Sequence, residues 1–309
     1  MMARGLMIFR EAGLASRMHW IWLALGLALV AATSTAGAQE RVTFPSLDAD
    51  LTGGKPTTVS GFLYRPEGPG PFPAVVGLHG CNGLMDKQGK IWALYGTWAE
   101  ILSKEGYIVL LADSFSPRGY GDLCAVLPIS ARPVLPDREA PRDAFGAMEY
   151  LRSRSDVRPE SIAILGQSYG GLAMLFTVAD DALPNSVPPS KDFRAAIALY
   201  PNCPPIMAAK PNWKPRQPML FLMGEADNFA PPVPCKDMLA REKAAGGPAI
   251  DVHFYPDTFH AFDHPNLPKT ELTNVKIPPD GHSPIVGTNP EARADAIDRV
   301  KKFLAEELK

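Results

Sequence analysis

Residues 161–171 read Ser-Ile-Ala-Ile-Leu-Gly-Gln-Ser-Tyr-Gly-Gly and are the most informative stretch of the chain. The first half is a short apolar run with β-branched residues, which is typical of a strand buried on both faces. Gly166-Gln-Ser-Tyr-Gly170 then forms a G-x-S-x-G pattern, and Leu172-Ala-Met-Leu-Phe continues with helical character. A strand, a sharp turn and a helix in this order predict a nucleophile elbow with Ser168 at its tip.

The two glycines of this pattern have a steric explanation. In so tight a turn, side chains two residues before and two residues after Ser168 would collide, so both positions need glycine. We expect Ser168 in a strained backbone conformation that lifts its hydroxyl clear of the sheet. A Gly-rich turn inside an ordinary α/β unit is the alternative interpretation.

The composition favours one globular α/β domain. With 309 residues, of which 46% are hydrophobic, the chain is long enough for one sizeable core. The formal net charge of −2 gives no electrostatic case for a nucleic-acid partner. The 32 prolines cluster between the apolar segments and therefore indicate stiff loops rather than disorder.

The N-terminal residues are typical of a secretion signal. An apolar run, residues 20–32, follows three arginines and precedes an A-x-A cleavage site at residues 36–38. A membrane anchor is the alternative, but the run is shorter than the ~20 residues that a span needs. We expect a signal peptide over residues 1–38, with Met18 as an alternative start. The remainder would be exported, periplasmic or secreted, without a stable membrane anchor after cleavage.

Four cysteines follow this leader: Cys81, Cys124, Cys203 and Cys235. An even count in an exported protein favours disulfides. We expect Cys81–Cys124 and Cys203–Cys235, because each pair falls in loops after strands that are expected to be neighbours. A zinc site is the alternative, but no C-x-x-C pair or Cys/His cluster supports it. We expect no metal and no organic cofactor.

Apolar and periodic segments alternate along the rest of the chain. The expected strands cover residues 41–44, 57–64, 74–78, 107–112, 161–165, 193–199, 219–223 and 250–255. The expected helices cover residues 91–105, 140–154, 234–245 and 289–308, and one more continues from residue 172. This alternation implies right-handed crossovers and a mostly parallel sheet covered by helices on both faces.

Three Pro-rich segments interrupt this pattern: residues 179–192, 204–216 and 264–290. Each is too short for a second domain, so we interpret all three as loops. The fold prediction is therefore one α/β domain over residues 39–309, without a large lid.

A serine hydroxyl is a poor nucleophile at neutral pH, so Ser168 needs a base, usually a histidine oriented by a carboxylate. In this architecture the order along the chain is serine, acid, histidine. His260 lies in the loop after the last strand and is the predicted base, with His264 in reserve. The segment after residues 219–223 contains Glu225 and Asp227; we expect Asp227 to be the acid, and Glu225 is the alternative.

The negative charge that develops on the substrate's carbonyl oxygen needs fixed hydrogen-bond donors, and backbone N–H groups serve this purpose best. Tyr169 begins the helix after the elbow, where the helix dipole also favours an anion. The second donor is expected from the loop His79-Gly-Cys-Asn-Gly83, after the strand at residues 74–78, and Cys81 is the predicted residue.

These motifs together resemble the α/β-hydrolase superfamily, and more narrowly the dienelactone hydrolase family. The resemblance spans roughly residues 55–309. It is carried by Leu78-His-Gly-Cys-Asn-Gly, Gly106-Tyr, Asp113-Ser-Phe-Ser-Pro-Arg-Gly, Gly166-Gln-Ser-Tyr-Gly-Gly, Gly224-Glu-Ala-Asp and Phe259-His-Ala-Phe. The resemblance implies an α/β-hydrolase fold.

The chain departs from the family's pattern at three places. The archetype has a cysteine nucleophile where this chain has Ser168, and its acidic residue before the oxyanion donor is here Gly80. Of the family's two arginines that hold a substrate carboxylate, the resemblance supplies only Arg118, because His264 follows His260 instead. The departures favour ordinary esterase chemistry over hydrolysis of dienelactone itself.

The predicted function is a serine hydrolase that cleaves small or medium carboxylic esters or lactones through an acyl-enzyme. Trp92, Arg118, Tyr120 and Tyr169 are candidates for the pocket lining, with core packing or a solvated Arg as the alternative for each. The expected partner is therefore a small-molecule substrate, and nothing in the sequence indicates an oligomeric state. A serine peptidase of the same fold and a non-catalytic binding protein on a hydrolase scaffold are the rival hypotheses.

Overall fold

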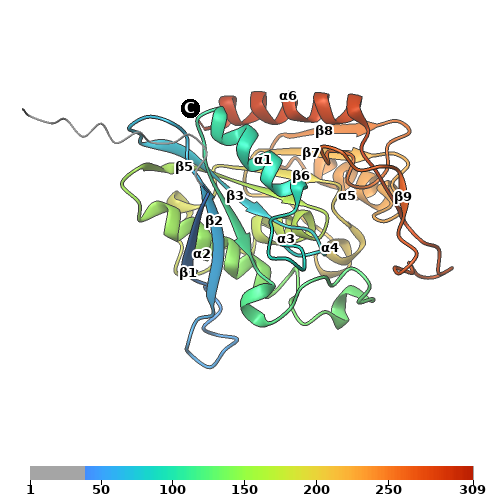
Figure 1. Ribbon diagram of the computed structural model, residues 1–309, viewed down its shortest axis with the longest axis horizontal. Helices are drawn as coiled ribbons and strands as arrows, with labels where there is room; N and C mark the ends of the chain where they lie inside the picture. The colour runs from blue at the N-terminus through green and yellow to red at the C-terminus, as the bar shows by residue number, and fades with distance from the viewer. Residues whose placement is uncertain (1–38, 309) are drawn as a thin grey trace, which may run out of the picture. The chain divides into compact units, whose positions relative to one another are not determined.

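The computed structural model describes residues 39–308, and the predicted signal peptide over residues 1–38 lies outside them. The described part of the chain folds around an eight-stranded sheet with the order β1-β2-β4-β3-β5-β6-β7-β8 (Figure 1). The strands are β1 (Glu40–Pro45), β2 (Thr58–Tyr64), β3 (Phe72–Leu78), β4 (Ile108–Asp113), β5 (Val157–Gln167), β6 (Ala195–Leu199), β7 (Met219–Gly224) and β8 (Ile250–Tyr255). Only β2 pairs antiparallel with its neighbours, and every pairing from β4 to β8 is parallel. The predicted mostly parallel sheet is confirmed.

Helices connect the parallel strands and cover both faces of the sheet. They are α1 (Ala93–Lys104), α2 (Glu139–Arg152), α3 (Tyr169–Val178), α4 (Pro204–Ala209), α5 (Pro232–Ala244) and α6 (Pro290–Glu307). The connection from β3 to β4, which contains α1, moves toward the β1 edge of the sheet. The connections that contain α2, α3 and α5 move toward the β8 edge. Right-handed crossovers therefore place α1 on one face and α2, α3 and α5 on the opposite face. The last helix, α6, packs on β6 and β7 and lies on the α1 face (Figure 1).

The central strands are buried over most of their length, as their apolar sequences predict. Every residue of β6 and β7 is buried, and β5 is buried from Ser161 to its end. The structure extends β5 backwards to Val157, four residues before the expected start, because Val157 pairs with Phe72 of β3. Residues 158–160 interrupt the apolar pattern, so the sequence does not indicate this extension.

Two of the three Pro-rich segments contain an α-helix or paired strands, so the prediction of plain loops there was wrong; residues 179–192 contain a single 3-10 turn at Pro189–Lys191. Helix α4 lies in residues 204–216 and begins with two prolines, which the first helical turn tolerates because its N–H groups have no intrahelical partner. In residues 264–290, the short strands β9 (Thr270–Glu271) and β10 (Ile285–Val286) pair antiparallel. A parallel bridge joins Val286 to His260, so this hairpin packs beside the edge of the sheet where the strands end.

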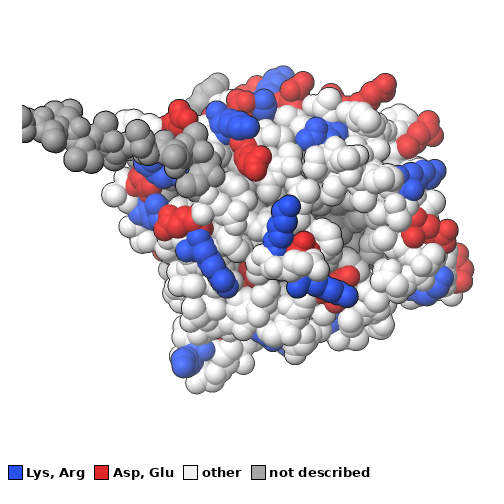
Figure 2. All heavy atoms as spheres, viewed as in Figure 1, with Lys and Arg blue, Asp and Glu red and all other residues white. Residues whose placement is uncertain are grey.

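The surface of the described part carries charges of both signs. Figure 2 shows acidic and basic side chains interspersed on the visible face, in agreement with the near-zero net charge. Among residues 39–308, no helix combines the length and the apolarity that crossing a bilayer requires.

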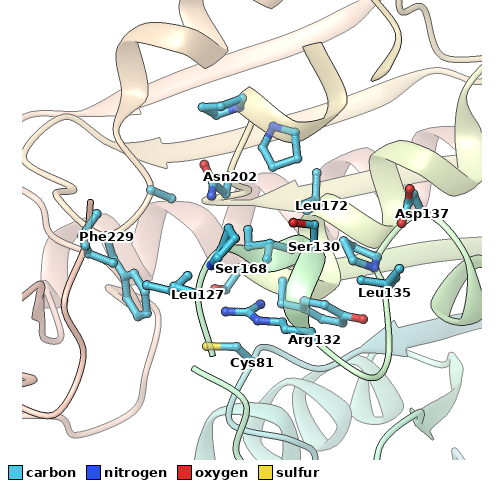
Figure 3. Close-up of a pocket in the computed structure, with 18 of the residues that line it drawn as sticks. Cys81, Leu127, Ser130, Arg132, Leu135, Asp137, Ser168, Leu172, Asn202 and Phe229 are labelled. Carbon is cyan, nitrogen blue, oxygen red and sulfur yellow. The ribbon is translucent and has the colours of Figure 1, made fainter. Parts of the chain in front are cut away.

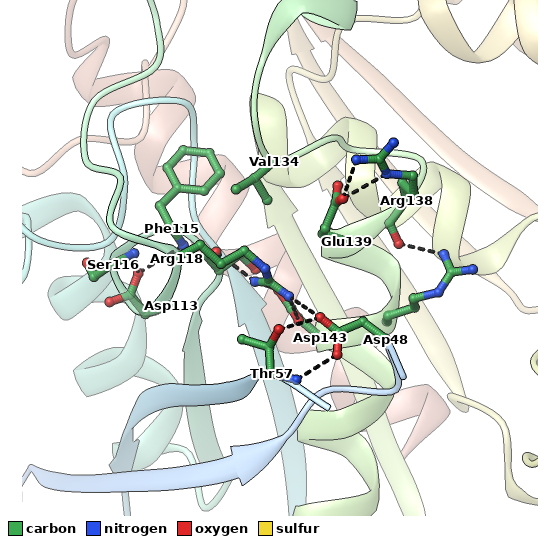
Figure 4. Close-up of polar contacts among 12 residues, drawn as sticks. Asp48, Thr57, Asp113, Phe115, Ser116, Arg118, Val134, Arg138, Glu139 and Asp143 are labelled. Carbon is green, nitrogen blue, oxygen red and sulfur yellow. Dashed lines mark hydrogen bonds and ion pairs between the residues drawn. The ribbon is translucent and has the colours of Figure 1, made fainter. Parts of the chain in front are cut away.

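Arg118 belongs to a buried ion-pair cluster, and its predicted role as a substrate ligand was wrong. Its Nη1 donates to Asp143 at 2.8 Å and to the Ser114 carbonyl at 2.8 Å, and its Nη2 donates to Asp48 at 2.9 Å (Figure 4). The side chain is 12% exposed. A short 3-10 turn at Ser116–Arg118 directs it toward β1 and α2 rather than toward Ser168.

Asp48 connects this cluster to the N-terminal segment of the described chain. We expect Asp48→Asn to lower the free energy of unfolding by about 3 kcal/mol at pH 7. Burial alone would raise the pKa of Asp48, but hydrogen bonds from Thr57 and Arg118 outweigh it and hold the pKa below its ordinary value. The carboxylate therefore stabilises the fold above the ordinary pKa, and this contribution is lost as the pH falls through the folded-state pKa. Urea unfolding of both proteins at several pH values between 7 and 3 measures this. A difference that stays constant over that range would contradict the assignment.

Candidate active site

Ser168 stands on the turn between β5 and α3. Its backbone angles are φ 55° and ψ −116°, so the predicted strained conformation is present. A Cβ on Gly166 would overlap the carbonyl of Gly170, and a Cβ on Gly170 would overlap the carbonyl of Leu78. Glycine is therefore required at both positions, and the second one allows α3 to approach β3 closely.

His260 and Asp227 form a hydrogen-bonded chain with Ser168. His260 follows β8, and its Nε2 lies 2.9 Å from Ser168 Oγ. Its Nδ1 lies 2.7 Å from Oδ2 of Asp227, which follows β7. The other oxygen of Asp227 accepts the backbone N–H groups of Phe229 and Ala230 at 2.9 and 2.8 Å. With Nδ1–H donated to the carboxylate, Nε2 is free to accept the Ser168 hydroxyl.

The two reserve candidates lie outside this chain of hydrogen bonds. Glu225 is exposed and forms an ion pair with Lys236 at 2.8 Å. His264 uses Nδ1 to accept the backbone N–H of Asn266 at 3.1 Å. Burial lowers the pKa of His264 from its ordinary value.

The site lies where the chain changes direction across the sheet. Strands β3 and β5 are neighbours, and their following segments leave toward opposite faces, which creates a crevice at their carboxyl ends. Cys81, Ser168 and Tyr169 all border one cavity there. Among residues 39–308, the backbone N–H groups of Cys81 and Tyr169 donate to no other protein group. Both amides are thus available to a ligand beside Ser168.

The loop after β3 is fixed by buried side chains on two sides. The N–H of Gly80 donates to the Tyr95 hydroxyl at 2.8 Å. The N–H of Ser114 donates to Nε2 of His79 at 3.2 Å, so the neutral ring carries its proton on Nδ1, 2.8 Å from the Gly80 carbonyl. Burial lowers the pKa of His79, which agrees with a neutral imidazole. A Cβ on Gly80 would lie 2.9 Å from the Tyr95 hydroxyl, so a side chain at this position would have to displace that hydroxyl.

The structure contains both expected disulfides. Cys81–Cys124 joins the loop after β3 to the long loop before α2, and Cys203–Cys235 joins α4 to α5. A backbone hydrogen bond from Leu123 to the Cys81 carbonyl, at 2.8 Å, adds a second link at the first disulfide. The loop that presents the Cys81 N–H is therefore held covalently.

Two pockets meet at Ser168 (Figure 3 shows the larger). The larger has a volume of about 570 Å³ and the smaller about 230 Å³. Both are bordered by Cys81, Ser168, Phe229 and His260. Side chains that line only the larger include Leu127, Ile129, Arg132, Tyr169, Leu172 and Asn202. Side chains that line only the smaller include Trp92, Tyr95, Tyr200, His264, Leu267 and Leu272.

Two further residues predicted to line the pocket, Trp92 and Tyr120, differ in their outcome. Trp92 lines the smaller pocket. Tyr120 lines neither pocket, and its side chain faces solvent with 41% of its surface exposed. The prediction for Tyr120 was wrong because the loop after β4 turns its aromatic side chain outward.

Sequence analysis missed a buried carboxylate behind the site, Asp263. It accepts hydrogen bonds from Trp98 Nε1, Gln167 Nε2 and the Tyr200 hydroxyl at 2.7, 2.7 and 2.6 Å. Burial raises the pKa of Asp263, although these three donors oppose the shift. The Tyr200 ring packs edge-on against the imidazole of His260, with ring centres 4.6 Å apart. One signal was available: Asp263 is a carboxylate in the otherwise apolar run that follows His260.

A mostly parallel sheet with an elbow serine at its switch point defines the α/β-hydrolase fold. The family model described as "Dienelactone hydrolase family" matches residues 59–308. The chain therefore belongs to the dienelactone hydrolase family.

Curated relatives match part of the chain. A probable 2-oxo-3-(5-oxofuran-2-ylidene)propanoate lactonase from a Bradyrhizobium species is 32% identical over 130 residues, covering 41% of this chain and 48% of the relative. The quorum-quenching protein AidA from Acinetobacter baumannii is 30% identical over 146 residues, covering 46% of this chain and 44% of the relative. The matched segments thus span less than half the length of each relative.

Solved structures share the fold over most of the chain. The dienelactone hydrolase-like promiscuous phosphotriesterase P91 from metagenomic libraries superposes with a TM-score of 0.63 and 19% identity, covering 88% of this chain and all of that one. A putative dienelactone hydrolase from Klebsiella pneumoniae superposes with a TM-score of 0.58 and 17% identity, covering 87% and 99%. At this level of identity the likeness shows the fold.

Proposed function

We propose that the protein is a serine hydrolase that cleaves carboxylic esters or lactones through an acyl-enzyme. The hydrogen-bonded chain Ser168–His260–Asp227 carries this proposal. Ser168 attacks the substrate carbonyl while His260 Nε2 takes the hydroxyl proton. Asp227 holds the imidazole in the correct tautomer and stabilises the imidazolium that forms.

The tetrahedral intermediate places its negative charge between two backbone N–H groups, those of Cys81 and Tyr169. Tyr169 is the first residue of α3, so the helix dipole adds to this stabilisation. His260 then gives its proton to the leaving alkoxide, and the acyl group stays on Ser168. In the second half-reaction His260 takes a proton from a water molecule as that water attacks the acyl carbonyl. His260 then returns the proton to Ser168 Oγ as the bond between Ser168 and the acyl group breaks and the acid leaves.

The two pockets support substrates of small to medium size. The cavities of about 570 and 230 Å³ lie on either side of Ser168, which suits the acyl and alcohol halves of one ester. Similarity to a probable lactonase supports lactones as well as open-chain esters.

The test is turnover of p-nitrophenyl esters of increasing acyl length by the oxidised protein, residues 39–309, beside peptide p-nitroanilides of similar size. We expect ester turnover and labelling of Ser168 by a fluorophosphonate probe. Preference for the anilides would favour the peptidase alternative. A folded protein with no turnover and an unlabelled Ser168 would favour the binding-protein alternative.

Cys124→Ser is expected to lower kcat for a good ester about tenfold, with a smaller change in KM. The reason is that the disulfide partner of Cys124 carries a proposed oxyanion N–H, which contributes mainly in the transition state. Steady-state kinetics at a temperature well below unfolding measures this. Cys235→Ser, which opens the other disulfide, is the control and should lower Tm while kcat stays within about twofold. Equal losses of kcat in both variants would contradict the local role.

We also infer that residues 1–38 are a cleaved export signal and that residues 39–309 form a single exported domain. Support comes from the arginines, apolar run and A-x-A site of the leader, and from the two disulfides, which persist in oxidising compartments. Mass spectrometry of the protein from a periplasmic or culture fraction tests the inference. A product that begins at Met1 or Met18 would refute it.

A further inference from the structure

Asp263 is a buried carboxylate whose three hydrogen-bond donors are neutral side chains. It lies three residues after His260, in the segment that follows β8, and is 2% exposed. Its donors come from three other elements: Trp98 in α1, Gln167 at the end of β5 and Tyr200 directly after β6. Asp263 therefore connects the loop of the base to the nucleophile elbow, to α1 and to the turn after β6.

The other buried carboxylates of residues 39–308 have partners of a different kind. Four pair with a basic side chain, namely Asp48, Glu139 and Asp143 with arginines and Asp227 with His260. The other two are Asp113, which accepts backbone N–H groups, and Glu242, whose Oε1 has no partner in the described residues. Asp263 is held by side chains, all of them neutral, and two of these adjoin the catalytic serine and histidine.

No ion pair neutralises the carboxylate of Asp263 within the described part of the chain. Arg293 of α6 comes near, but its Nε donates to the backbone carbonyl of Asp263 at 3.2 Å. Burying a charge among neutral groups is unfavourable, and burial accordingly raises the pKa of Asp263. An asparagine at this position would satisfy the same donors without that cost. The charge therefore calls for an explanation beyond packing.

Tyr200 links this charge to the base. Its hydroxyl donates to Oδ1 of Asp263 at 2.6 Å, and its ring packs edge-on against the imidazole of His260, with ring centres 4.6 Å apart. Tyr200 has a φ of 41°, in the left-handed region, so its backbone is strained and the surrounding contacts must hold it. Tyr200 thus contacts the buried anion with its hydroxyl and the base with its ring.

We propose that Asp263 positions His260 through Tyr200 and that its negative charge stabilises the imidazolium formed when His260 takes a proton. Asp227 acts on the same ring directly, at 2.7 Å from Nδ1. Asp263 lines neither pocket, so it acts on the base and not on the substrate. A charge acts over longer distances in a buried site than in water, because the effective dielectric constant is lower. This role rests on the proposed hydrolase function, since it concerns the base of that mechanism.

The ionisable groups around His260 and Asp263 define what a pH profile reports. Asp227 and Tyr200 face His260, and burial raises the pKa of Tyr200 well above its ordinary value, so its hydroxyl stays protonated. Burial also raises the pKa of Tyr95, on which the charge of Asp263 acts, so this hydroxyl stays protonated as well. Neither tyrosine contributes a titration between pH 4 and 9.

We expect Asp263→Asn to move the acid limb of the kcat/KM profile to lower pH by about one unit and to lower kcat at the optimum about fivefold. The sign follows because loss of an anion disfavours the imidazolium, so a lower pH is needed to form it. Asparagine keeps the contacts, since its oxygen can accept the Trp98 and Gln167 N–H groups while its NH2 group donates to the Tyr200 oxygen. Kinetics with a neutral p-nitrophenyl ester between pH 4 and 9 measures both effects.

His264 is the neighbour whose own titration has to be separated from that of the base. Burial lowers its pKa, the charge of Asp263 opposes that shift and Arg293 adds to it. The profile is therefore repeated with Asp263→Asn in a His264→Asn background, where the asparagine oxygen can still accept the backbone N–H of Asn266. The shift should persist at about one unit. A shift that disappears together with His264 would overturn its assignment to the base.

Asp192→Asn is the matched control. Asp192 is a half-buried carboxylate that pairs with Arg216 and precedes β6, whereas Tyr200 follows the other end of the same strand. This variant should lower Tm and leave the acid limb where it is. If Asp263→Asn behaved in the same way, with a lower Tm and an unmoved limb, Asp263 would be a structural residue and the proposal would be overturned.

Tyr200→Phe tests the path from the buried charge to the base. Phenylalanine keeps a ring against His260 but gives up the hydrogen bond to Asp263, so we expect kcat to fall about fivefold. In the double variant Asp263→Asn/Tyr200→Phe, the loss should be clearly smaller than the product of the two single losses. Losses that multiply in full would show that Asp263 does not act through Tyr200.

NMR spectroscopy tests the effect on His260 without turnover. In protein labelled with 15N-histidine, the midpoint of the His260 ring titration should lie about one pH unit lower in Ser168→Ala/Asp263→Asn than in Ser168→Ala. If the wild type hydrolyses no ester but this difference is seen, the hydrolase proposal fails and the role of Asp263 stands. If esters are hydrolysed and neither the kinetic limb nor the titration midpoint moves, the role of Asp263 fails and the hydrolase proposal stands.

Discussion

Ser168→Ala is expected to lower kcat for every p-nitrophenyl ester by about 10⁴- to 10⁶-fold. Without the hydroxyl no acyl-enzyme forms, and His260 has no serine proton to accept. The oxyanion donors and both pockets remain, so the residual rate reports their contribution to the uncatalysed attack of water. Steady-state assays at high enzyme concentration, together with loss of fluorophosphonate labelling, measure the effect.

A matched serine control is available at Ser153, which ends α2 and whose hydroxyl donates to the Tyr150 carbonyl. Ser153→Ala should keep full activity. If Ser168→Ala retained more than about 1% of the wild-type rate with a purified, folded protein, another nucleophile would have to be sought.

Asp227→Asn is expected to lower kcat by about 10⁴-fold, with little change in Tm. An asparagine oxygen still accepts the N–H groups of Phe229 and Ala230, so the loop keeps its shape. Its amide nitrogen cannot accept the Nδ1–H of His260, and the imidazole is driven to the tautomer that carries its proton on Nε2. That nitrogen then donates to Ser168 instead of accepting from it. Steady-state kinetics at neutral pH with the best ester measures the loss.

Glu225→Gln is the matched comparison, because Glu225 is the other carboxylate of the same loop. Its ion pair with Lys236 is exposed, and such pairs contribute at most about 1 kcal/mol. We expect kcat within twofold of the wild type. A large loss in Glu225→Gln together with a small one in Asp227→Asn would reverse the assignment of the acid.

The features that the sequence predicts well are those with a local cause. The elbow is fixed by glycines within two residues of Ser168, and both strand type and helix type follow from apolar spacing nearby. The order of serine, acid and histidine also follows from topology, since each residue comes directly after a strand. The structure places His260 within hydrogen-bond distance of both Ser168 and Asp227.

The errors concern side chains whose partners are distant in the sequence. Arg118 stands in the expected loop, but its partners Asp48 and Asp143 lie 70 and 25 residues away, and no local pattern indicates them. Arg132, which lines the larger pocket beside Ser168, was missed for the complementary reason. Its surroundings in the sequence are a Pro-rich loop, and its burial results from packing on Tyr169, which only the folded chain reveals.

Three strained residues at this site limit the stability that the protein can gain while it keeps its activity. Ser168, Tyr200 and Ala261 have φ values of 55°, 41° and 57°, and all three lie in or beside the hydrogen-bonded chain. Each such residue costs about 1–3 kcal/mol, which the buried sheet must offset. Mutations that relax these turns would be favoured by selection for stability alone and removed by selection for activity. Thermostable descendants of this chain should therefore gain their stability in the sheet, the helices and the distant loops, while these three turns stay as they are.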